Sequence, residues 1–201
     1  MPIPHAEIQR HFRRADPVVH RVIRQVGPFT LKPNRNRFGM LVGSIISQQL
    51  STKAARTIRG RLEELVQPLP MTAESIAKLS KQQLRSAGLS NNKADYVLDL
   101  TAKVLEGDVR LKAMGRKTDE EVIEDLTRVH GIGRWTAQMF LIFSLGRLDV
   151  FPYDDLGVRM AIKNLYGLAE PPNKAVAQRI AAPWKPFSSV ASWYCWRSLD
   201  L

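Results

Sequence analysis

The chain of 201 residues contains a single cysteine, Cys195. One cysteine excludes an intrachain disulfide, and it excludes zinc or iron–sulfur centres held by four cysteines. We therefore expect Cys195 to be a buried, reduced thiol. No apolar run approaches the roughly 20 residues of a membrane-spanning helix, and the segment Met1–His5 lacks the charged and apolar regions of a signal peptide. These absences predict a cytoplasmic protein.

The alternating apolar pattern of β-strands is also missing, as are repeats and low-complexity linkers. Apolar residues instead recur at helical spacing, so we expect an all-α fold. Ser51 and Thr118 are expected to cap helices, Thr118 within a capping box that includes Glu121. The expected helices cover 4–26, 38–61 (as one helix or as two broken at 48–51), 72 onward, a short one from 80 to 87, 91–105, 119–129, 135–145, 155–166 and 186–196.

Acidic residues are few relative to basic ones. Thirty Lys and Arg against nineteen Asp and Glu give a formal net charge of +11 and a pI near 10.2. Such an excess indicates a polyanionic partner, most commonly a nucleic acid. A charge that serves only solubility, or an anionic membrane surface, remains an alternative at this point.

The most specific local motif is the segment Leu126–Ala137, which reads helix, Gly131-Ile132-Gly133, helix. Two glycines around one apolar residue allow a tight turn and a close approach to a ligand, with Ile132 anchoring the turn in the core. The first N–H groups of the second helix would face a phosphate without reading base sequence. His130 and Arg134 flank the turn. The alternative is a plain helical corner with glycine at the end of its first helix.

Several ordered motifs together resemble the helix-hairpin-helix (HhH-GPD) DNA glycosylase superfamily, most closely its 3-methyladenine DNA glycosylase II (AlkA-like) branch. The resemblance covers about Phe38 to Trp196. The motifs are Ser44-Ile-Ile-Ser-Gln-Gln-Leu-Ser-Thr-Lys-Ala-Ala55, Ala87-Gly-Leu-Ser90 with Lys93-Ala94, Val129-His-Gly-Ile-Gly-Arg-Trp-Thr-Ala137, Asp149-Val-Phe-Pro-Tyr-Asp-Asp-Leu-Gly-Val-Arg159, Trp184-Lys-Pro-Phe187 and Trp193-Tyr-Cys-Trp196.

The resemblance implies two helical lobes with a DNA-binding cleft. One lobe is a central bundle over 38–146, with the helix-hairpin-helix at about 119–145, and the other joins 1–37 to 147–201. The chain is too short for the N-terminal β-domain that some relatives carry. Asp155 is expected to face the hairpin across the cleft.

Cleavage of an N-glycosidic bond develops positive charge on the sugar, which a fixed carboxylate can stabilise while it orients a water molecule. The candidates are Asp149, Asp154 and Asp155, and spacing alone does not choose among them; one of the adjacent pair could simply cap the helix that follows. The family's catalytic aspartate precedes a basic residue by four positions. Asp155 stands in this relation to Arg159, so the resemblance favours Asp155, with Asp154 second.

Relatives that also cleave the DNA strand carry a lysine after the hairpin, where this chain has Trp135. No lysine lies between Lys117 and Lys163. Because the amine that would form a Schiff base is missing, we expect a monofunctional enzyme that uses water and leaves an abasic site.

The resemblance also implies the remaining site residues. It places Trp135 and Trp196 in the base pocket, where indoles favour cationic bases, although a core role for either is the alternative; Met139 and Leu156 occupy positions where relatives carry tyrosines. Gln49 is expected to fill the gap left by the extruded base, with Leu50 in the core. The expected DNA contacts are Gln49, Ser51, Gly131, Gly133, Arg134 and Thr136, and a Na⁺ or K⁺ ion is expected on the carbonyls of Thr127, Val129 and Gly131.

Together these features predict a monomeric glycosylase of the cytoplasm and nucleoid that removes alkylated purines, of the 3-methyladenine and 7-methylguanine type, from duplex DNA. It would require no cofactor, iron–sulfur cluster or zinc and would bind no membrane. The alternatives are a non-catalytic helix-hairpin-helix module, an enzyme of the same fold for deaminated or oxidised bases, a glycosylase with lyase activity, and a nucleotide-binding or structural helical protein; for the last, no phosphate-loop signature is present.

Overall fold

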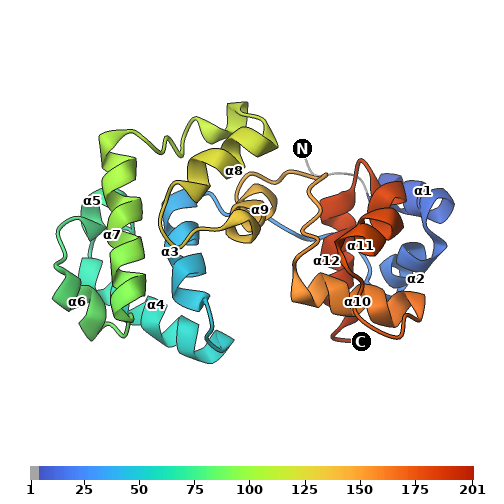
Figure 1. The fold of residues 1–201 in the computed structure, drawn as a ribbon, viewed down its shortest axis with the longest axis horizontal. Helices are drawn as coiled ribbons and strands as arrows, with labels where there is room; N and C mark the ends of the chain where they lie inside the picture. The colour runs from blue at the N-terminus through green and yellow to red at the C-terminus, as the bar shows by residue number, and fades with distance from the viewer. Residues whose placement is uncertain (1–4) are drawn as a thin grey trace. The chain divides into compact units, whose positions relative to one another are not determined.

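The computed structural model describes residues 5–201, and every regular element in that range is helical, which confirms the predicted all-α class (Figure 1). The predicted first helix begins at Pro4, which lies outside the described residues. The chain divides into two compact units, Pro33–Leu145 and the combination of Met1–Lys32 with Gly146–Leu201. No helix within residues 5–201 combines the length and apolar character needed to cross a bilayer.

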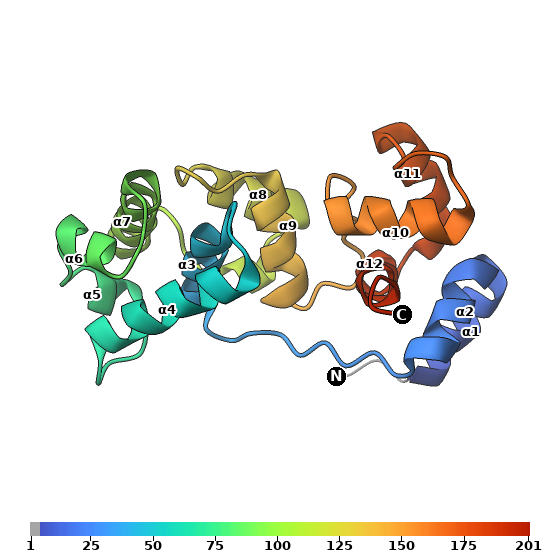
Figure 2. The same cartoon turned by 90° about the horizontal axis from the view of Figure 1, so that it is seen from below.

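The unit Pro33–Leu145 is built around α3, which packs against α4, α7 and α9, while α8 packs on α9 (Figure 2). Its buried side chains include Ile45, Leu100 and Phe140. Two short helices, α5 and α6, lie against α7. The helices of this unit are α3 Arg37–Ser47, α4 Thr52–Val66, α5 Ala73–Ile76, α6 Lys81–Ser86, α7 Asn91–Glu106, α8 Asp119–Thr127 and α9 Arg134–Phe143.

The second unit surrounds α12, against which α2 and α10 pack. Its core is aromatic and aliphatic, with Phe12, Trp184 and Tyr194 fully or almost fully buried. A buried carboxylate, Asp16, caps α2 and accepts hydrogen bonds from Trp184 Nε1 at 2.8 Å and from the Tyr166 hydroxyl. The helices are α1 His5–Ala15, α2 Pro17–Val26, α10 Leu156–Tyr166, α11 Lys174–Ala181 and α12 Ser188–Ser198.

The predicted helix caps are confirmed. Ser51 accepts from the Ala54 N–H and begins α4, so the pattern over 38–61 is two helices with the break where it was expected. Thr118 and Glu121 form the capping box of α8. Ser80 caps α6 by accepting the Gln83 N–H, and the Ser80 N–H in turn donates to the Gln83 side-chain oxygen. These local rules hold because each cap satisfies an N–H group that the helix itself leaves unpaired.

Two features of the second unit were missed. The region 4–26 is not one helix, because Asp16 caps a new one that begins with Pro17, a residue suited to the first helical position. The helix α11 was not predicted at all. Asn173 caps it after two prolines, and Ala177 and Ala181 are its only buried residues within the described chain, so its apolar pattern is weak.

Candidate nucleic-acid interface and active site

The hairpin between α8 and α9 has the backbone that its sequence predicts. Gly131 has φ +79°, in the left-handed region that favours glycine. Ile132 is buried, as expected, and its N–H donates to the Val129 carbonyl at 3.1 Å. Gly133 is the N-cap of α9, and among residues 5–201 no side chain caps this helix. The positive end of the α9 dipole is therefore not covered by a capping side-chain oxygen.

Tyr96 gives a steric reason for glycine at position 131. A Cβ atom built on Gly131 would lie 2.1 Å from the Tyr96 ring, whereas one built on Gly133 would meet nothing within 4 Å. The aromatic ring on α7 thus packs directly on the turn, and the hairpin backbone rests against it. Of the two glycines, only Gly131 would bring an added side chain into a clash; at Gly133 the space is open.

A carboxylate on α7 fixes the other side of the turn. Asp99 accepts the His130 N–H at 2.8 Å and also pairs with Lys103. Burial would raise the pKa of Asp99, but the hydrogen bonds from Lys103 and the His130 backbone outweigh it and lower the pKa. The carboxylate is therefore ionised when it holds the hairpin.

The turn Gln48–Ser51 is tied to the hairpin. Gln48 Nε2 donates to the Gly131 carbonyl at 2.7 Å. Lys93 on α7 donates through Nζ to the carbonyls of Ile46 and Gln48, at 2.8 and 2.5 Å. Burial lowers the pKa of Lys93. The lysine donates to carbonyls at the end of α3 that the helix leaves unpaired, and it thereby holds the turn in place.

Gln49, the expected plug, is the only non-glycine residue among the described ones with a positive φ, +57°. Its side chain is exposed. A strained backbone at an exposed position indicates a constraint other than packing. The expectation for Leu50 was wrong: it is 40% exposed, because α3 ends at Ser47 and the turn carries Leu50 away from the core.

Two of the expected DNA contacts around the hairpin, Arg134 and Thr136, are constrained by their surroundings. Arg134 is paired with Glu120 through two bonds of 2.5 and 3.0 Å, so any contact with phosphate requires that this exposed pair opens. The Thr136 side chain is buried, which leaves only its backbone N–H in the first turn of α9 for a ligand. His130 lies exposed beside Asp99.

The three candidate carboxylates differ in their surroundings. Asp149 accepts from the Ser188 hydroxyl and N–H, at 2.5 and 3.3 Å, and so holds the start of α12. Asp154 is exposed. Asp155 is only 8% exposed and caps α10, with Oδ1 accepting the Val158 N–H at 2.8 Å.

A second donor also fixes Asp155. Trp196 on α12 donates its indole Nε1–H to the same Oδ1, at 2.8 Å. Gly157 makes room for this contact, since a Cβ there would lie 3.0 Å from Trp196 Cδ1 and 3.2 Å from Asp155 Oδ1. Hydrogen bonds to the ionised form stabilise a carboxylate and fix its direction. Asp155 is therefore a buried carboxyl group whose direction is fixed by two donors.

The expected base-pocket residues are spread over both units. Trp135 and Met139 are on α9, where Trp135 is 40% exposed and Met139 is buried. Leu156 is 66% exposed at the start of α10, and Trp196 is half-buried against Asp155. Trp135 and Leu156 thus expose part of their side chains, whereas Met139 is part of the packing of its unit.

Two of the three expected cation ligands already accept hydrogen bonds. The carbonyl of Gly131 accepts from Gln48, and that of Val129 accepts from the Ile132 N–H. Each carbonyl oxygen has a second lone pair, so these bonds are compatible with an ion. Cys195 is buried, as predicted, and burial raises the pKa of its thiol.

Sequence reasoning missed Tyr96, Lys93 and Asp99, the residues on α7 that hold the hairpin and the turn Gln48–Ser51. Lys93 stands inside a motif that carried the resemblance, but nothing in its local pattern predicts a contact with carbonyls some 45 residues earlier. Their spacing on one helix, at 93, 96 and 99, is the one available signal, because residues three apart share a helical face.

The family model of the HhH-GPD superfamily of base excision DNA repair proteins matches residues 42–186. The chain belongs to this superfamily. DNA-3-methyladenine glycosylase 1 of Schizosaccharomyces pombe is 34% identical over 95% of this chain and 86% of its own length. YfjP of Bacillus subtilis is 35% identical over 81% of this chain, and the match spans 59% of that protein.

Solved structures share the fold over nearly the whole chain. The S. pombe 3-methyladenine DNA glycosylase Mag1, in complex with abasic DNA, has a TM-score of 0.86 at 32% identity and covers 97% of both chains. The DNA-3-methyladenine glycosidase of Bacillus halodurans has a TM-score of 0.85 at 36% identity, covering 98% of this chain and 89% of its own. The predicted family is therefore confirmed.

Proposed function

We propose that this protein is a monofunctional DNA glycosylase that removes alkylated purines, of the 3-methyladenine and 7-methylguanine type, from duplex DNA. The observation that carries the proposal is the buried carboxylate of Asp155, oriented by Val158 and Trp196. The S. pombe and B. halodurans relatives are named as 3-methyladenine glycosylases, and one is bound to abasic DNA. A protein with this substrate would act in the cytoplasm, at the nucleoid, as a monomer.

In the proposed mechanism the hairpin binds a phosphate through the start of α9, and Gln49 replaces the extruded base in the duplex. Trp135 and Trp196 are proposed to contact the base. An N-alkylated purine is already cationic, so it needs no general acid to leave. Asp155 stabilises the positive charge that develops on the sugar and orients the attacking water molecule.

The proposal excludes strand cleavage by an enzyme amine, because Trp135 stands where lyases of this family carry lysine. Incubation with a panel of alkylated, deaminated and oxidised duplexes should release alkylated purines and leave intact strands that break only after alkali. Borohydride should trap no enzyme–DNA complex above background. A strong trapped band would overturn the monofunctional mechanism, and release confined to deaminated or oxidised bases would overturn the substrate class.

A further prediction separates two roles of Trp196. In Trp196→Phe the aromatic face remains but the donor to Asp155 is lost, so we expect kcat to fall about tenfold, the equivalent of one charge-assisted hydrogen bond, with little change in KM. Trp193→Phe is the control and should leave kcat unchanged, because Trp193 lies on the same helix but makes edge-to-face contacts with Phe29 and Tyr194. A rise in KM with constant kcat would instead make Trp196 a base platform only.

We also propose that the hairpin binds a monovalent cation. The carbonyls of Thr127, Val129 and Gly131 would hold it, those of Val129 and Gly131 through their remaining lone pairs. Such an ion would add positive charge where the phosphate binds. No step of the base-release chemistry passes through it, and no other cofactor is proposed.

A further inference from the structure

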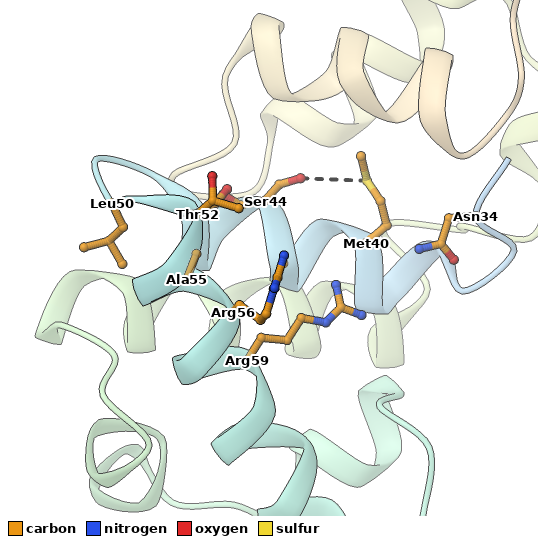
Figure 3. A pocket seen from close by; sticks show the side chains of 10 residues that line it. Asn34, Met40, Ser44, Leu50, Thr52, Ala55, Arg56 and Arg59 are labelled. Carbon is orange, nitrogen blue, oxygen red and sulfur yellow. Dashed lines mark hydrogen bonds between the residues drawn. The ribbon is translucent and has the colours of Figure 1, made fainter. Parts of the chain in front are cut away.

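The unit Pro33–Leu145 also has a groove that the proposed mechanism does not use. A groove of about 420 Å³ lies between α3 and α4, next to the turn Gln48–Ser51 (Figure 3). Met40 and Ser44 line it from α3, and Arg56 and Arg59 line it from α4. Leu50 of the turn and Thr52 at the start of α4 form the end of the groove nearest the turn.

The groove lies in a region without acidic residues. No Asp or Glu occurs between Asp16 and Glu63, so α3, the turn and the first three turns of α4 carry only positive charge. The cations Lys53, Arg56 and Arg59 follow one another at intervals of three along α4, which places neighbours about 5–6 Å apart at their Cβ atoms. A row of cations on a helix beside a groove suits a chain of phosphates.

The two arginines are held differently. Arg59 pairs with Glu63 at 2.9 Å and lies across α3 at Gly43, where a Cβ would meet its Nη1 at 2.8 Å. The absence of a side chain at position 43 thus lets Arg59 enter the groove. Arg56 is exposed and has no ion-pair or hydrogen-bond partner among residues 5–201. Arg56 is therefore an available cation, and Arg59 is a positioned one.

The turn separates this groove from the hairpin. Gln48 reaches the hairpin through the Gly131 carbonyl, whereas Leu50 and Thr52 line the groove. In the minor groove of B-DNA, about 6 Å wide, one strand lies on each side of an inserted residue. If Gln49 enters there while the hairpin binds the damaged strand, the phosphates that reach the α3–α4 groove belong to the other strand.

We propose that the α3–α4 groove binds the phosphodiester backbone of the strand opposite the damaged base, with Arg56 and Arg59 as the phosphate contacts. This inference rests on the proposed function for the identity of the polymer, duplex DNA. It adds a lesion-independent contact that holds the undamaged strand while the opposite base is extruded.

The first test measures binding to a duplex with a stable abasic-site analogue, so it needs no base release and stays informative if the proposed activity fails. Arg56→Gln should weaken binding about tenfold and reduce the slope of log K against log salt by about 0.9, as expected for one lost phosphate contact. The matched control is Arg61→Gln, which removes the same charge from an exposed position of α4 outside the groove. Equal effects of Arg56→Gln and Arg61→Gln would contradict a specific phosphate contact in the groove.

The second test identifies the strand. Neutral methylphosphonate linkages are placed near the abasic analogue, in one strand at a time. In the opposite strand they should weaken binding by the wild type about as much as Arg56→Gln does, and should have little further effect on Arg56→Gln. The proposal is wrong if the effect of Arg56→Gln is lost only when the methylphosphonates are in the damaged strand. The groove would then bind the damaged strand.

Discussion

Replacing Asp155 by Asn is expected to lower the rate of base release at least about 100-fold, while duplex binding stays constant or becomes tighter. The substitution removes the negative charge that would stabilise the developing cation of the sugar. It leaves the groups proposed to bind phosphate untouched. Single-turnover release from a methylated duplex, together with a binding curve on the abasic analogue, measures both quantities.

The structure makes this substitution a clean test. An Asn side-chain oxygen can still accept the Val158 N–H and the Trp196 Nε1–H, so the start of α10 should keep its geometry. Asp154→Asn is the control, because Asp154 is adjacent but exposed. Normal activity in Asp155→Asn combined with a loss of activity in Asp154→Asn would assign the reaction to Asp154 and contradict a catalytic role of Asp155.

The local rules of the sequence predicted much of this geometry. Asp155 was expected either to cap a helix or to catalyse, and its observed cap is compatible with both, since a cap fixes the direction of the carboxylate. The hairpin could be predicted from local sequence as well, because glycine readily adopts the positive φ that the turn requires at Gly131. Caps and turns depend on neighbours in sequence, so one sequence is enough to find them.

Contacts between distant segments could not be predicted in this way. Leu50 was placed in the core because it is apolar, but the end of α3 decides its exposure, and that end depends on Lys93 and Gln48 binding across the unit. Trp196 was expected to stack on a base. Its hydrogen bond to Asp155 depends on how α12 packs on α10, which no spacing of residues reveals.

Substituting Gly131 by Ala is expected to have the largest effect on the fold of the hairpin. At φ +79° an L-residue is strained by about 1–2 kcal/mol, and the new methyl group would overlap the Tyr96 ring, adding about 1–3 kcal/mol. We expect a loss of about 2–5 kcal/mol in the free energy of unfolding, measured by denaturant titration, and a loss of binding to any duplex regardless of lesion.

Gly133→Ala separates folding from binding at the same turn. Its φ of −96° suits any residue, and the added Cβ meets no atom within 4 Å, so stability should fall by about 1 kcal/mol or less, the cost of a poorer N-cap. Duplex binding should nevertheless weaken, because the methyl group would stand where a phosphate approaches the start of α9. Unchanged affinity in a folded Gly133→Ala protein would remove the hairpin from the DNA interface. In a Tyr96→Leu background, Gly131→Ala should recover the part of its loss that is due to overlap but keep the part due to backbone strain, because only the ring has been removed.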